Sequence, residues 1–142
     1  MQVQFGVLRD QRMNRRPAKL YTGVSGIFLL VQGTSTLVFH LYPPLDRAFP
    51  ALLDITQMIP VHSMLHIVTG VLALIILFRG GEHAAYGYAL GFGSFYFLLG
   101  LAGLLSGLPL GLGLQPFDHP IHLVLGAAGL LTTYLSKSWR IA

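Results

Sequence analysis

The sequence predicts an all-α integral membrane protein, a four-helix bundle built from two repeated helical hairpins. Hydrophobic residues make up 54% of its 142 residues and charged residues only 10%, whereas a soluble domain carries about 25% charged residues. A helix needs about 20 mainly apolar residues to cross a ~30 Å bilayer core. Four stretches without Asp, Glu, Lys or Arg are long enough: residues 20–44, 55–78, 83–117 and 119–136.

Prolines and helix-capping residues along the chain predict where each helix begins and ends. Helices are expected over residues 20–41, 47–59, 61–78, 84–108 and 118–136. Pro43 and Pro44 end the first helix, because proline cannot continue its hydrogen-bond ladder. The second, capped by Asp46, is short and amphipathic, and is expected on the outer membrane surface; an ordered loop is the alternative because of Pro50. Asp118 is the expected N-cap of the last helix.

Basic residues predict the orientation. Eight of the nine flank the spans on one side (Arg9, Arg12, Arg15, Arg16, Lys19, Arg79, Lys137 and Arg140), and only Arg47 falls on the other. The positive-inside rule therefore places both termini in the cytoplasm, in a bacterial inner or thylakoid membrane. Residues 1–19 are expected to form a cytoplasmic basic tail and residues 20–142 the four-helix transmembrane domain. Because the net charge of +4 is concentrated beside the spans, it does not indicate nucleic-acid binding.

Two motifs occur twice in the same order. Residues 26–33 and 93–100 both read Gly-x-Phe-x4-Gly, and residues 65–70 and 121–126 both read aliphatic-His-aliphatic-Val-x-Gly. Two spans return the chain to its starting side. The hairpins should therefore be parallel repeats about an axis along the membrane normal.

These segments resemble an uncharacterised family of small four-helix bacterial membrane proteins, known only as a domain of unknown function. The resemblance covers about residues 18–136. It rests on the Gly-x-Phe segments and on the His-x-x-x-Gly segments at His66/Gly70 and His122/Gly126. It implies the fold and no activity.

The repeated histidines are the candidate cofactor and metal ligands. Neutral imidazole is a common axial ligand of haem iron and serves equally for the magnesium of chlorophyll. Gly70 and Gly126, one turn from His66 and His122, would make room for a flat macrocycle. The alternative is structural: each histidine donates a hydrogen bond to a neighbouring helix, and each glycine permits close packing. His62 and His66, at i and i+4, form a second candidate pair for a divalent metal, but their helix offers no carboxylate or thiolate to complete a set.

The expected function is non-enzymatic. The predicted spans hold no carboxylate relay, and the chain has no cysteine nucleophile. We expect an accessory subunit of a larger membrane complex, with a photosynthetic pigment–protein complex as the setting considered, and with lipid and other membrane subunits as partners. Chlorophyll is the first cofactor candidate and haem b the alternative, in a b-type electron-transfer protein; carotenoid or lipid are further candidates. A ligand-free packing or stress protein is the remaining alternative.

Overall fold

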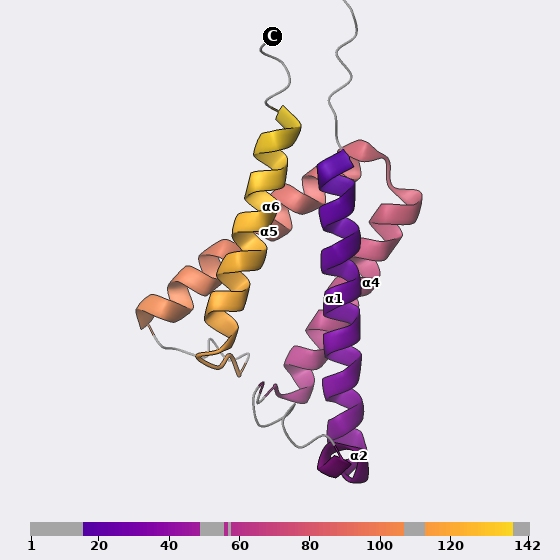
Figure 1. Cartoon of the computed structure of the whole chain (residues 1–142), viewed down its shortest axis with the longest axis vertical. Coiled ribbons are helices and arrows are strands. Elements are labelled where there is room, and N and C mark those ends of the chain that lie inside the picture. The colour runs from indigo at the N-terminus through magenta and orange to yellow at the C-terminus, as the bar shows by residue number, and fades with distance from the viewer. Residues whose placement is uncertain (1–15, 49–55, 57, 107–112, 138–142) are drawn as a thin grey trace, which may run out of the picture.

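The computed structural model describes residues 16–48, 56, 58–106 and 113–137, and all regular structure in this part is helical (Figure 1). Its five helices are α1 (Arg16–Leu41), α2 (Pro43–Ala48), α4 (Pro60–Arg79), α5 (Glu82–Ser106) and α6 (Asp118–Lys137). The prediction of an all-helical chain is confirmed.

The ends of the long helices follow from proline and glycine. α1 begins at Arg16, four residues before the predicted start, because Pro17 is tolerated in a first turn. The last residues of the predicted basic tail therefore belong to α1. Pro60 begins α4, and α4 ends at Arg79, where the N–H of Gly80 donates to the carbonyl of Ile76 at 2.9 Å.

Two local expectations need correction. The short helix covers Pro43–Ala48, so Asp46 lies inside its first turn and is not its N-cap; most of the predicted 47–59 helix lies outside the described residues. Asp118 does not cap α6 either. Its Oδ2 atom accepts a hydrogen bond from the Gln115 N–H at 2.8 Å, and the carboxylate thereby closes the turn that precedes the helix.

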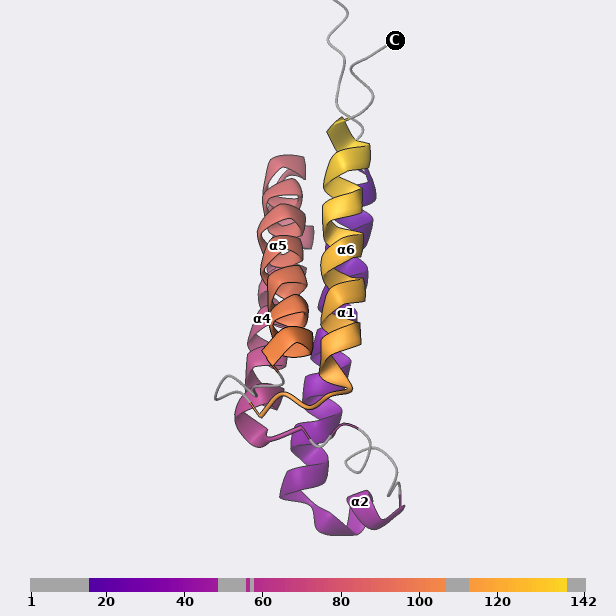
Figure 2. The ribbon, with the colours of Figure 1, turned by 90° about the vertical axis from the view of Figure 1, so that its left-hand side faces the viewer.

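The long helices pack mainly as two pairs, α1 with α4 and α5 with α6 (Figures 1 and 2). Contacts between the pairs are sparser, and the backbones of α4 and α6 hardly approach each other. α4 and α5 are joined by the short turn Gly80–Gly81. Figure 1 shows the pairs diverging away from the Arg16 end of α1.

Close packing within each pair depends on glycine. An added methyl group at Gly70 would lie 2.7 Å from the backbone nitrogen of Leu30 in α1, and one at Gly126 would overlap the backbone of Phe97 in α5. No side chain at either position could be accommodated without separating the helices. These glycines therefore set the helix–helix distance.

In the part of the chain that the structure describes, three helices are long and apolar enough to cross a membrane: α1, α4 and α5. α6 is not among them, because Asp118, His119 and His122 at one end and Lys137 at the other lower its mean hydropathy. Many large apolar side chains point outward, including Phe78 at 79% exposure. Such a surface suits lipid better than water.

The interior is rich in small, hydroxyl and aromatic side chains. An aromatic column runs along α5, where Tyr88 stacks on Phe92 at 5.0 Å between ring centroids and Phe92 on Tyr96 at 4.0 Å. From α1, Tyr21 donates a hydrogen bond to the Leu125 carbonyl of α6 at 2.7 Å. This column and its polar contacts join the two helix pairs.

Candidate metal centre

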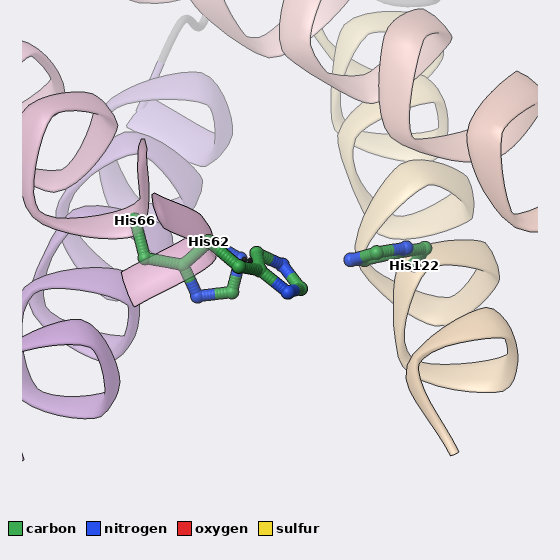
Figure 3. A group of neighbouring side chains, drawn as sticks. All are labelled: His62, His66 and His122. Atoms are coloured by element: carbon green, nitrogen blue, oxygen red, sulfur yellow. Dashed lines mark hydrogen bonds between the residues drawn. The ribbon is translucent and has the colours of Figure 1, made fainter. Parts of the chain in front are cut away.

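Three histidines from two helices meet at one end of the molecule. His62 and His66 lie one turn apart on α4, and residues at i and i+4 share a helix face. His122 lies in the second turn of α6. Their side chains are 3%, 4% and 2% exposed. Figure 3 shows the imidazoles of α4 extending toward that of His122.

The spacing of the rings suits a shared metal ion. One ring nitrogen from each residue can be chosen so that all three lie within 4.8 Å of one another. The Nε2 atoms of His62 and His66 are 3.1 Å apart, and the ring centroids of His62 and His122 are 6.1 Å apart. Around a tetrahedral zinc ion with Zn–N bonds near 2.0–2.1 Å, two ligand nitrogens are about 3.3 Å apart. The nitrogens therefore lie within about 1.5 Å of ligand spacing.

Hydrogen bonding leaves the cluster unsatisfied. The Nδ1 atoms of His62, His66 and His122 are buried and have no hydrogen-bond partner among the described residues. A buried polar atom without a partner costs about 1–3 kcal/mol. Three such atoms in one place are unusual in a native interior. A bound cation, with water or lipid oxygen on the remaining nitrogens, would remove that cost.

A small cavity of about 160 Å³ adjoins the three histidines. Its other walls are apolar or aromatic except for Thr69: Leu65, Phe92, Phe95, Tyr96, Leu99 and Leu114. The Tyr96 ring meets His122 edge to face at 4.8 Å between centroids and fixes one side of that imidazole. Three protein ligands beside a cavity leave a fourth coordination position open.

One carboxylate lies near the cluster. Asp118 is only 3% exposed, and its charge interacts electrostatically with His62 and with Tyr96. It lies outside the three-histidine set. This nearby anion would compensate the charge of a bound cation.

The four site residues predicted from the sequence divide into two groups. His66 and His122 come together, whereas Gly70 and Gly126 lie in the helix contacts described above and do not line the cavity. This placement agrees with the packing alternative for the glycines. Ligand-sized pockets usually have volumes of about 300–1,000 Å³, so a haem or chlorophyll ring does not fit the present space. A tetrapyrrole would require the two helix pairs to separate further.

The other histidines have different surroundings. His40 hydrogen-bonds the Met58 carbonyl. The ring of His119 fills the space left by the missing side chain of Gly103. His83 is exposed at the opposite end of the molecule. None of these three belongs to the described metal-ligating cluster.

The sequence predicted two histidine pairs of this cluster but not the three histidines as one site. It suggested the His62/His66 pair from helical spacing, and His66 with His122 from the repeat. The missing ligand of the first pair is His122, which another helix supplies. Two overlapping pairs that share His66 are the signal that predicts a three-histidine set.

Comparison of the chain with protein-family models, with curated proteins and with solved structures found no match.

Proposed function

We propose that this chain is a membrane protein that binds a first-row transition-metal ion, such as Zn²⁺, through His62, His66 and His122. The carrying observation is that three buried imidazoles from two helices offer nitrogens within 4.8 Å of one another. Imidazole ligands suit zinc, copper, iron and nickel, whereas magnesium and calcium prefer oxygen ligands. The neighbouring charge of Asp118 also favours a cation.

The proposed setting is a four-span bundle of two parallel repeats. Close contacts recur when residue numbers rise by 67 from α1 to α5 and by 56 from α4 to α6. Gly26 packs on Ala73 as Gly93 packs on Gly129. Gly70 packs on Leu30 as Gly126 packs on Phe97, and Gly33 packs on Ser63 as Gly100 packs on His119. Three equivalent contacts support a pseudo-two-fold relation between the hairpins.

The fourth span and the orientation belong to the same proposal. α6 contains 20 residues, and a helix of that length is about 30 Å long, enough to cross a bilayer core. Its packing along α5 would bury its polar end among neighbouring helices. With four spans, the basic residues lie on the cytoplasmic side and the histidine cluster lies toward the opposite face.

Within this setting, we keep a non-enzymatic role as accessory subunit of a membrane complex. Apart from the three histidines, the described residues that line the cavity carry no carboxylate, amine or thiol. A bound ion would then serve structure or ligand binding. A tetrapyrrole, haem b or chlorophyll, is the alternative occupant of His66 and His122, and its absorption spectrum would distinguish it from a single ion.

Metal content tests the proposal. The full chain, purified in mild detergent and equilibrated with zinc, should hold one ion per chain by elemental analysis. His66→Leu should lose most of this zinc, because only two ligands on different helices remain. His83→Leu is the matched control and should bind as the parent does, since His83 is exposed and remote from the cluster.

Equal zinc binding by the parent and by His66→Leu would refute the site. Bands of a haem or chlorophyll in the purified parent, lost in His66→Leu, would instead establish the tetrapyrrole.

Labelling of introduced cysteines tests the membrane orientation. The chain has no native cysteine, so only the introduced residue reacts. Phe117→Cys should react with a membrane-impermeant maleimide in intact cells, because Phe117 precedes α6 and is exposed. Gly81→Cys should react only after lysis. The reverse pattern would invert the proposed topology.

A further inference from the structure

The ion site joins the two helix pairs at the end where they diverge. His62 and His66 belong to the α1–α4 pair, and His122 to the α5–α6 pair. The described backbones of α4 and α6 make few close contacts with each other. The rings of His62 and His122, with centroids 6.1 Å apart, provide one contact between these two helices.

The opposite end of the molecule is joined independently of the histidines. There the Gly80–Gly81 turn connects the pairs covalently. Polar contacts from α1 to the other pair also lie toward this end. Thr22 donates to the Ala85 carbonyl at 3.4 Å, and the hydroxyls of Ser25 and Tyr88 are 3.4 Å apart. One end is thus held by the chain itself, and the other by three rings with unpartnered nitrogens.

We infer that the metal ion acts as a latch between the hairpins: bound zinc draws α4 and α6 together at the histidine end and holds them there. This inference rests on the proposed metal site. Without an ion, α4 and α6 meet through a contact between the His62 and His122 rings, 6.1 Å between centroids, and the adjoining cavity leaves room for a wider separation. With an ion, ligand nitrogens now up to 4.8 Å apart contract toward about 3.3 Å. The ion binds the closed arrangement better and therefore shifts the population toward it.

Distances between spin labels on the full chain test the latch. The pair Met64→Cys and Val124→Cys reports the histidine end, and the pair Phe78→Cys and Tyr134→Cys reports the opposite end. All four side chains are exposed, and nitroxide labelling removes the thiols as metal ligands. Zinc added to chelator-treated protein should shorten the first distance by about 1 Å and narrow its distribution. The second distance should not change.

His122→Leu distinguishes zinc that bridges α4 and α6 from zinc that binds to α4 alone. It keeps His62 and His66, so zinc can still attach to α4 alone, and it should show no zinc-dependent change in the Met64–Val124 distance. His83→Leu should respond as the parent does.

The outcomes distinguish this inference from the proposed function. Zinc bound by the parent at one ion per chain with an unchanged Met64–Val124 distance would overturn the latch and leave the metal site standing. Equal contraction in His122→Leu would also overturn it. Failure of the parent to bind zinc would overturn the site, and the latch with it.

Discussion

The two hairpins share their central helix contacts and differ at the histidine end. In the α1–α4 hairpin, the hydroxyls of Thr36 and Ser63 hydrogen-bond at 2.8 Å. At the positions of the α5–α6 hairpin that are equivalent under the proposed repeat, Gly103 faces the ring of His119. The smaller residue on one helix is matched by a larger one on its partner. Close packing is thus maintained by different chemistry.

The ligand positions differ in the same way. His62 and His66 of the first hairpin correspond, under the proposed repeat, to Asp118 and His122 of the second. Each hairpin presents two polar side chains from one helix face, but only the second includes a carboxylate. Under the proposed repeat, the two hairpins therefore contribute differently charged side chains to the histidine cluster. The following predictions test how far the two hairpins are equivalent.

The largest expected effect comes from the shared glycine contacts. Gly126→Ala should lower the free energy of unfolding by about 3 kcal/mol, because the methyl group meets the rigid backbone of Phe97. Gly70→Ala should cost about 2 kcal/mol for the same reason. Gly87→Ala is the control: its methyl group would meet no described atom within 4 Å, so helix propensity alone should stabilise by up to about 1 kcal/mol. Denaturation in detergent measures all three. Unfolding energies equal to the parent's for both Gly126→Ala and Gly70→Ala would break the packing argument.

Replacing Thr36 and Ser63 together should show strong coupling between their effects on the free energy of unfolding. Thr36→Gly alone leaves a cavity, and Ser63→His alone overfills the contact. The double variant reproduces the Gly103/His119 arrangement in the first hairpin. It should be more stable than the sum of the single changes by about 1–2 kcal/mol in a double-mutant cycle. Additive effects would mean that the two contacts are not equivalent.

The carboxylate should tune the metal site. Asp118→Asn keeps an oxygen for the Gln115 N–H but removes the charge that acts on His62. Zinc affinity should fall by about tenfold, in the range of outer-shell substitutions. Calorimetric titration measures this, with Asp46→Asn, remote from the cluster, as the control. Unaltered affinity would assign Asp118 to the turn alone.

The smallest expected effect distinguishes two tyrosines at equivalent positions. Tyr21→Phe loses a 2.7 Å hydrogen bond to the Leu125 carbonyl and should cost about 1 kcal/mol. Tyr88→Phe loses only a 3.4 Å contact with Ser25 and should cost about 0.5 kcal/mol. The same detergent denaturation resolves the order. A larger loss for Tyr88→Phe would reverse it.

The helix ends were the part of the fold that the sequence predicted best, because residues close in sequence determine them. Pro43, Pro60 and the Gly80–Gly81 turn lie at helix ends, and the sequence placed those ends within a few residues. The start of α1 was predicted too late, because polar residues before a span can still be helical. The roles of Asp46 and Asp118 were wrong, since cap and turn carboxylates share the same local sequence pattern.

The site depended more on tertiary packing. The repeat placed His66 and His122 in equivalent segments, but the angle between α4 and α6 decides whether His62 joins them. Their relative placement follows from close contacts within each helix pair, such as Gly126 against Phe97, and from the sparser contacts between the pairs, which helical periodicity does not encode. The size of the cavity has the same origin.

A small rotation of α4 at the Gly80–Gly81 turn produces a larger displacement at its histidine end. From Gly80 to His66 the helix is about 21 Å long, so a 1 Å displacement at the histidine requires a rotation of only about 3° at the turn. An added methyl group at Gly81 would meet no atom of the described chain within 4 Å, whereas one at Gly80 would lie 2.6 Å from the carbonyl oxygen of Ile76, so the open side of the turn is at Gly81. The residues that move furthest then lie at the histidine end, while the end that carries the Gly80–Gly81 turn stays nearly still.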